Sequence, residues 1–178
     1  MKFIAYIATS LDGYIADKNG DIDWLTNIDN PDGSDFGYAE FMASIDAVIM
    51  GRNTFETVLG FGGDWPFDKP VFVLSQSLST LPESLPDSVK LLQGTLQQIE
   101  LTLKPYNFKR MYIDGGKVIQ TFLAENKIDE LILTRAPILL GHGVPLFTQS
   151  DIQSHYRHVK TTVYLDTLVK SHYIKLAE

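Results

Sequence analysis

The stretch VIMGRNTFETV, residues 48–58, passes from apolar to polar residues within four positions. Its first three residues suit a strand that is buried on both faces of a sheet. Gly51 and Arg52 then lead into a segment that we expect to be a helix. The N-terminus of such a helix has free backbone N–H groups that stabilise an anion, and the guanidinium of Arg52 suits a phosphate. The alternative is a plain turn in which Asn53 or Thr54 caps the helix and Arg52 faces solvent.

A second junction of this kind lies in MYIDGGKVIQTFL, residues 111–123. Gly115 and Gly116 follow a predicted strand and open a predicted helix. Adjacent glycines let the backbone approach a ligand such as a pyrophosphate, although a tight turn would also explain them. Such junctions gather at the carboxyl ends of strands in an open α/β sheet, so we expect a dinucleotide to span both. Neither is a G-x-G-x-x-G motif and the chain has no G-x-x-x-x-G-K-[ST] loop, which disfavours a Rossmann dehydrogenase and a nucleotide phosphotransferase.

Short apolar runs alternate with segments of helical spacing along the rest of the chain. The runs that predict strands are residues 3–8, 47–50, 71–74, 89–92, 110–113 and 130–136. The segments that predict helices are residues 35–44, 95–103 and 117–126. This alternation indicates a single α/β domain over residues 1–178. The final stretch alternates apolar and polar residues around Asp166 and predicts an antiparallel hairpin, which makes the sheet mixed.

The composition limits the possible partners. A formal net charge of -7 disfavours a nucleic acid or an anionic membrane as the main partner. The chain has no cysteine, which excludes disulfides and thiolate metal sites, and no run approaches the ~18 apolar residues of a membrane span. We therefore expect a cytoplasmic protein. His155 and His158 stand three residues apart, but their stretch resembles the start of a strand without an acid at ligand spacing, so we expect no metal.

Five motifs together resemble the dihydrofolate reductase-like superfamily, and in particular its branch named for the C-terminal reductase domain of the bacterial riboflavin enzyme. They come in the family's order and span nearly the whole chain: SLDGYIADKNGDIDW (10–24), DAVIMGRNTFE (46–56), VFVLSQS (71–77), MYIDGGKVIQTFL (111–123) and IDELILTRAPILLGHGVPLF (128–147). The resemblance implies a three-layer α/β/α fold with a mostly parallel sheet. It also implies that the protein binds NADPH and transfers hydride to a pterin- or pyrimidine-like ring.

The same resemblance implies cofactor contacts at individual residues. Gly51, Arg52 and Thr54 match the turn that binds a cofactor phosphate. Arg52 would face the adenosine 2′-phosphate, which favours NADPH over NADH. The other implied contacts are Ser75 and Gln76 on the adenosine side, Gly115, Gly116 and Lys117 in the pyrophosphate loop, and Ala8 and Ile15 beside the nicotinamide.

Three further residues are implied on the substrate side. Asp35 precedes the strand at 47–50 much as the family's folate-binding acid precedes its strand, so it would anchor the substrate ring and handle a proton. The alternative is that Ser34 or Asp35 only caps the following helix. Thr134 would support this carboxylate, or be an ordinary β-branched strand residue. Trp24 would form a wall of the active site, or be a core aromatic residue whose N–H is satisfied nearby.

The sequence leaves the substrate open. A riboflavin-pathway pyrimidine reductase needs cations for a ribosyl phosphate, and the first helix of that branch carries Arg and His, whereas residues 35–47 carry neither. A true dihydrofolate reductase is disfavoured by the long polar segment between Trp24 and Asp35. A zinc deaminase is excluded by the lack of cysteine. The alternative from another class is a non-catalytic nucleotide-binding protein of the same fold. Because related domains pair through the sheet edge, we expect a homodimer.

Overall fold

The computed structural model describes residues 1–177. Its strands are β1 (Lys2–Thr9), β2 (Tyr14–Ala16), β3 (Ala47–Gly51), β4 (Val71–Leu74), β5 (Val89–Leu92), β6 (Arg110–Asp114), β7 (Glu130–Arg135), β8 (Val144–Pro145), β9 (Tyr156–Tyr164) and β10 (Leu168–Lys175). Its helices are α1 (Asp23–Thr26), α2 (Tyr38–Ala43), α3 (Arg52–Gly60), α4 (Leu96–Leu103) and α5 (Gly116–Ala124), with a short 3-10 turn, η1 (Lys104–Tyr106).

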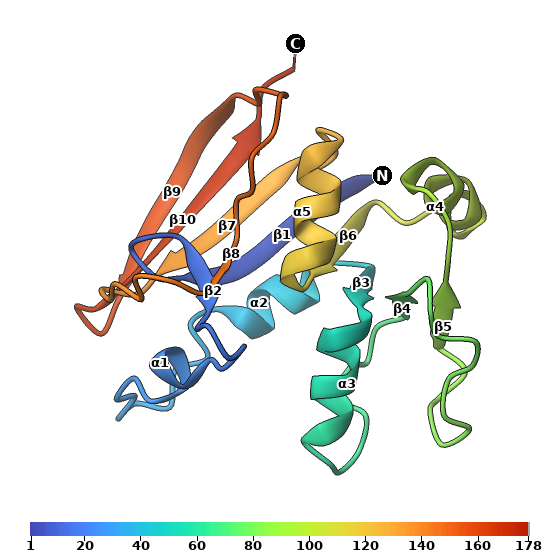
Figure 1. Cartoon of the computed structure of the whole chain (residues 1–178), viewed down its shortest axis with the longest axis horizontal. Coiled ribbons are helices and arrows are strands. Elements are labelled where there is room, and N and C mark those ends of the chain that lie inside the picture. Colours follow the sequence, from blue (N-terminus) through green and yellow to red (C-terminus); the bar gives the residue numbers. More distant parts are fainter. Residues whose placement is uncertain (178) are drawn as a thin grey trace.

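Eight of these strands form one sheet in the order β5-β4-β3-β6-β1-β7-β10-β9 (Figure 1). Strands β5 to β7 of that order are parallel to one another. Strand β10 runs antiparallel to β7, and β9 runs antiparallel to β10. The prediction of a mostly parallel sheet that ends in an antiparallel hairpin is therefore confirmed. Strands β2 and β8 pair separately as a small second sheet.

Both faces of the central sheet are covered, which explains the consecutive apolar runs. Residues 47–50 of β3 are fully buried. Their successive side chains point to opposite faces of the sheet, and both faces are covered. On one face they join a core with α4 and α5, through residues such as Ile99 and Ile119. On the other face they pack with α2 and α3, through Phe41 and Phe55. The result is the predicted three-layer α/β/α arrangement.

Helix α2 begins three residues later than the predicted segment at 35–44. The backbone is left-handed at Phe36, with a φ of 53°, and at Gly37, with a φ of 79°, so neither residue can belong to a right-handed helix. Helix α4 matches its prediction closely because Thr95 and Gln98 form a complete capping box at its start.

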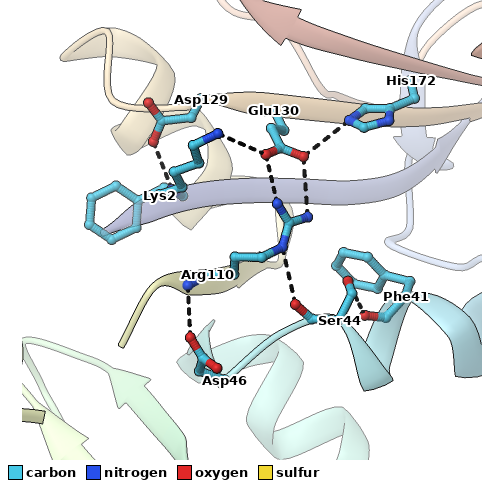
Figure 2. Close-up of polar contacts among 9 residues, drawn as sticks. Lys2, Phe41, Ser44, Asp46, Arg110, Asp129, Glu130 and His172 are labelled. Carbon is cyan, nitrogen blue, oxygen red and sulfur yellow. Dashed lines mark hydrogen bonds and ion pairs between the residues drawn. The ribbon is translucent and has the colours of Figure 1, made fainter. Parts of the chain in front are cut away.

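An ionic cluster joins four strands at the amino ends of the parallel strands (Figure 2). Glu130 is only 2% exposed and accepts two hydrogen bonds from the guanidinium of Arg110, at 2.8 and 3.2 Å. It also lies 3.1 Å from the imidazole of His172 and 3.6 Å from the amine of Lys2. Burial tends to raise the pKa of Glu130, but the bonds and charges of Arg110 and His172 outweigh it and hold that pKa below its ordinary value. The cluster links β1, β6, β7 and β10 at the end of the sheet opposite the candidate site.

Candidate active site

Several of the residues predicted from sequence lie at the carboxyl ends of the parallel strands. Met50 of β3 lies beside Asp114 of β6 in the register, and Ala8 of β1 lies beside Thr134 of β7. Strands β3, β6, β1 and β7 are consecutive neighbours at the centre of the sheet. Ligands of open α/β sheets bind outside this edge. The structure thus brings both glycine junctions and the first strand to one place.

The two glycine junctions pack directly against each other. Gly115 has a φ of +91°, and a Cβ atom there would collide with the hydroxyl of Thr54 in α3. A Cβ atom on Gly51 would lie 2.9 Å from the side chain of Val118 in α5, closer than side chains tolerate. Glycine is therefore required at both positions for the N-termini of α3 and α5 to lie together.

Both of these helices begin without a side-chain cap. Gly51 and Gly115 are the N-cap residues of α3 and α5, and among residues 1–177 neither helix start has a side-chain cap. The interpretation that Asn53 or Thr54 caps α3 is wrong, because both residues lie inside the helix. Helix α4, which starts with a full capping box, shows the contrast. The first-turn N–H groups of α3 and α5 are thus free for an anion, as a dinucleotide pyrophosphate or phosphate would require.

Arg52 lies at the start of α3 and is about half exposed. Its Nε donates to Glu56 at 2.7 Å, and one Nη donates to the hydroxyl of Ser77 at 3.0 Å. Ser77 belongs to the turn after β4, so the structure brings the strand exits of β3 and β4 together. Sequence reasoning overlooked Ser77 in favour of Ser75 and Gln76.

The predicted adenosine-side residues have structural partners of their own. The hydroxyl of Ser75 is buried and accepts bonds from the backbone N–H groups of Ser77 and Leu78, at 3.2 and 3.1 Å. The amide of Gln76 donates to the carbonyl of Gly94 at 3.1 Å. Both side chains hold the turn that carries Ser77, and their contact with a cofactor stays a prediction.

Gly116 is confined by Ile15 of β2. A Cβ atom on Gly116 would collide with the Cδ1 atom of Ile15, so the need for glycine here includes packing against this side chain. The predicted nicotinamide contact, Ile15, therefore lies over the start of α5. Lys117 follows in the first turn of α5 and is exposed.

Asp114 is the functional candidate that sequence reasoning missed. It is the last residue of β6, directly before Gly115, and it is partly exposed at the candidate site. Burial raises the pKa of Asp114 above its ordinary value, against the opposing effects of hydrogen bonds from the side chain of Tyr112 and the backbone of Gly115. Burial, together with the charge of Asp114, also raises the pKa of Tyr38 to about 12. The signal in the sequence was an acid at the end of an apolar strand, immediately before paired glycines.

Asp35 is exposed and its carboxylate is occupied by backbone groups. One oxygen accepts from the N–H of Gly37 and the other from the N–H of Ala39, both at 2.8 Å. These bonds, first that of Ala39 and then that of Gly37, lower the pKa of Asp35. This geometry matches the capping alternative, and an ionised carboxylate is a poor proton donor. Contact of Asp35 with a substrate stays a prediction.

Thr134 and Trp24 occupy different environments. Thr134 is 7% exposed in β7, and within residues 1–177 no hydrogen bond joins it to Asp35. Trp24 of α1 is partly buried, and its indole Nε1 atom is inaccessible and has no partner among the described residues. The alternative of a core tryptophan with a satisfied N–H is therefore not met.

Two of the resembling motifs interlock beside the site. The carboxylate of Asp12 accepts from the hydroxyl of Ser10 at 2.6 Å and from the N–H groups of Leu140 and Gly141, at 3.1 and 2.7 Å. The N–H of Leu146 donates to the carbonyl of Gly13 at 2.9 Å. The segments around residues 10–16 and 138–146 are thus one structural unit, which supports Ile15 over α5.

The order of the motifs and this geometry agree with a comparison of whole sequences. The family model of the RibD C-terminal domain matches residues 1–170. The chain belongs to this family.

Individual members and structural neighbours of the RibD C-terminal domain family cover the chain almost completely. The uncharacterized protein YwjB of Bacillus subtilis (strain 168) is 34% identical over 177 residues, which is 98% of either chain. The crystal structure of a Shewanella sp. PV-4 protein, which its name connects provisionally with riboflavin biosynthesis, is 46% identical with a TM-score of 0.93, and covers 99% of this chain and 100% of its own. Dihydrofolate reductase from Enterococcus faecalis complexed with NADP(H) has a TM-score of 0.63 at 17% identity, over 98% of this chain and 96% of its own, so its likeness shows the fold alone.

Two further observations concern metal ligands and membrane-spanning helices. Within residues 1–177, no group of three histidine, aspartate or glutamate side chains is arranged to hold a metal ion. Of the helices in that range, none has the length and apolar character needed to cross a bilayer.

Proposed function

We propose that this protein is an NADPH-dependent reductase that transfers hydride to a pterin- or pyrimidine-like ring. The observation that carries the proposal is the pair of uncapped helix N-termini, α3 and α5, which pack against each other at adjacent strand ends with Arg52 beside them. Free N–H groups at two neighbouring helix starts suit the two phosphate-bearing parts of the cofactor, the pyrophosphate and the adenosine 2′-phosphate. Membership of the RibD C-terminal domain family supports a reductase-like role.

The residues present fit this cofactor. The start of α5, with Gly115 and Gly116, would hold the pyrophosphate, and Lys117 is exposed beside it. Arg52 would hold the adenosine 2′-phosphate, with Ser77 as a neighbouring donor. A bound nicotinamide would supply the hydride, while the protein orients the rings and supplies the proton. The likeness in fold to a dihydrofolate reductase that binds NADP(H) supports this arrangement.

Asp114 is our candidate for the proton donor to the reduced ring. Its pKa is raised by burial, so its carboxyl stays protonated over a wider pH range than an exposed aspartate. It lies at the end of β6, directly before the start of α5, on which Ile15, the implied nicotinamide contact, packs. General acids work best when their pKa lies near the working pH. Asp35, whose pKa is lowered, is less suited to this step.

The substrate ring would lie against aromatic side chains near Asp114. The ring of Tyr38, at the start of α2, packs edge-on at 5.9 Å from the ring of Tyr6, which stacks on Phe41 at 4.4 Å. Helix α2 carries no arginine or histidine to hold a ribosyl phosphate, which disfavours 5-amino-6-(5-phosphoribosylamino)uracil as the substrate. We keep as the second candidate a non-catalytic protein that binds NADPH through the same residues.

The test is a panel of pterin, pyrimidine and quinone-like acceptors, followed by the loss of NADPH absorbance. On an acceptor that is reduced, Asp114→Asn should lower turnover on the order of 10²-fold. Wild-type turnover should fall as the pH rises through the raised pKa of Asp114, and the variant should lack that dependence. Glu125→Gln, at the far end of α5, is the matched control and should keep wild-type turnover. NADPH binding without reduction of any acceptor would favour the non-catalytic candidate.

A further inference from the structure

The turn that leads into α2 is held in an unfavourable backbone conformation. Phe36 is left-handed with a φ of 53°, which a bulky side chain rarely adopts, and Gly37 follows with a φ of 79°. Such residues persist where the surrounding structure over-determines them, and they cluster at functional sites. The contacts around this turn therefore indicate which residues impose its conformation.

Lys170 of β10 is the main contact from outside the turn. Its Nζ donates to the carbonyl of Phe36 at 2.6 Å, and the hydroxyl of Tyr6 donates to the same carbonyl at 3.2 Å. A Cβ atom on Gly37 would lie 2.7 Å from this Nζ and 3.1 Å from the hydroxyl of Tyr164. The amine of Lys170 thus occupies space that only glycine leaves open at position 37.

The amine of Lys170 is also held from its sides. It lies 4.9 Å from the ring centroid of Tyr164 and 5.6 Å from that of Tyr6, within the range of cation–π attraction. Its strand position is opposite Thr134, at the level of the candidate active site. Asp35 completes the turn from inside by accepting the N–H groups of Gly37 and Ala39.

The residue that this turn places is Tyr38, the first residue of α2. Helix α2 has only six residues, and the side chain that holds its first N–H groups, Asp35, belongs to the turn before it, so the start of α2 depends on that turn. The ring of Tyr38 packs beside Tyr6 and lies close enough to Asp114 to feel its charge. Tyr38 is 38% exposed, so part of its surface is accessible to a ligand.

We propose that Lys170 is a positioning residue, which fixes the left-handed Phe36–Gly37 turn and thereby holds Tyr38 as one wall of the substrate site, across from Asp114. The proposal rests on the proposed function for the identity of that site. Its physical content is that the ammonium anchors the carbonyl of Phe36 through a charge-assisted hydrogen bond. Without it the turn relaxes, and Tyr38 moves relative to Asp114, while α3 and α5 stay in place.

The test compares Lys170→Met, which keeps the apolar stem and loses the ammonium, with Lys160→Met on the neighbouring strand. The KM for the acceptor should rise on the order of tenfold in Lys170→Met, because a displaced contact residue misplaces the substrate. The Kd for NADPH should stay unchanged, since the residues proposed to hold its phosphates lie at the starts of α3 and α5 and in the turn after β4. Lys170→Arg should restore part of the loss, and Lys160→Met should behave as wild type. An unchanged acceptor KM in Lys170→Met, or a parallel loss of NADPH affinity, would overturn the proposal.

A second readout separates this proposal from the proposed function. In protein labelled with fluorotyrosine, the Tyr38 fluorine resonance, identified by its loss in Tyr38→Phe, should move in Lys170→Met and stay in Lys160→Met. This measurement needs no turnover. A Tyr38 resonance that does not move would refute the positioning role even if no acceptor is reduced. A resonance that moves, in a protein that reduces no acceptor, would contradict only the reductase assignment.

Discussion

Replacing Arg52 by alanine tests the cofactor assignment most directly. Its Nε is bonded to Glu56 and one Nη is bonded to Ser77, so the guanidinium has further N–H donors for a phosphate. A hydrogen bond to a charged group contributes about 1.5–3 kcal/mol. The side chain is 46% exposed and Glu56 lies beside it, so we take one bond at the lower limit. That corresponds to about a tenfold change in Kd.

Isothermal titration calorimetry with NADPH and NADH measures this change. Arg52→Ala should weaken NADPH binding about tenfold and leave NADH binding unchanged, because only NADPH carries the 2′-phosphate. Glu56→Gln is the matched variant on the same helix, and it should tighten NADPH binding because it removes a negative charge that lies beside Arg52. Both effects should shrink at high salt, since these side chains are exposed.

Two results of this titration would contradict the role of Arg52. If the wild-type protein binds NADPH and NADH equally, Arg52 does not hold a 2′-phosphate. If Arg52→Ala weakens both cofactors by the same factor, the side chain supports the turn between β3 and α3 instead.

Three further predictions concern the site and the stability of the fold. Gly115→Ala should abolish NADPH binding in a fluorescence titration, because the φ of Gly115 is +91° and a Cβ there would displace Thr54. Circular dichroism should still show a folded domain. Retained affinity would contradict the placement of the pyrophosphate. Glu130→Gln should lower the free energy of unfolding in urea by about 3 kcal/mol, since it leaves Arg110 without its buried partner. The pKa of Glu130 is lowered on folding, so this difference should be full above its ordinary value of 4.5 and vanish as the pH falls through the lower folded pKa. Asp35→Asn should lower the urea midpoint slightly, since an amide keeps only one of two acceptor oxygens, and kcat should stay near wild type. A loss on the order of 10²-fold in kcat would instead make this carboxylate a substrate or proton group.

The fold could be predicted from the sequence because its signals are local. Consecutive apolar residues marked the strands that are buried on both faces, and the alternation around Asp166 marked the hairpin of β9 and β10. The strand-to-glycine junctions at Gly51 and Gly115 were also visible in the sequence, because glycine permits the sharp turn that ends a strand. Parallel strands then place such junctions at one edge, whatever the details of packing.

Only the tertiary structure distinguishes the two candidate acids. Asp35 and Asp114 are both aspartates near predicted element ends, and the sequence does not distinguish their environments. Asp35 is exposed and accepts two backbone N–H groups, which lower its pKa, whereas partial burial at the end of the central strand β6 raises the pKa of Asp114. Desolvation depends on residues that pack from several elements, so it cannot be read from neighbours along the chain.

The same reason applies to the contacts that shape the site. Lys170 bonds to Phe36 across 134 positions of the chain, and Ile15 of β2 covers Gly116 of α5. Composition and periodicity determine which segments become strands and helices, since those depend on residues a few positions apart. The distance between two side chains from different elements depends on how all the layers pack, and only the folded chain sets it.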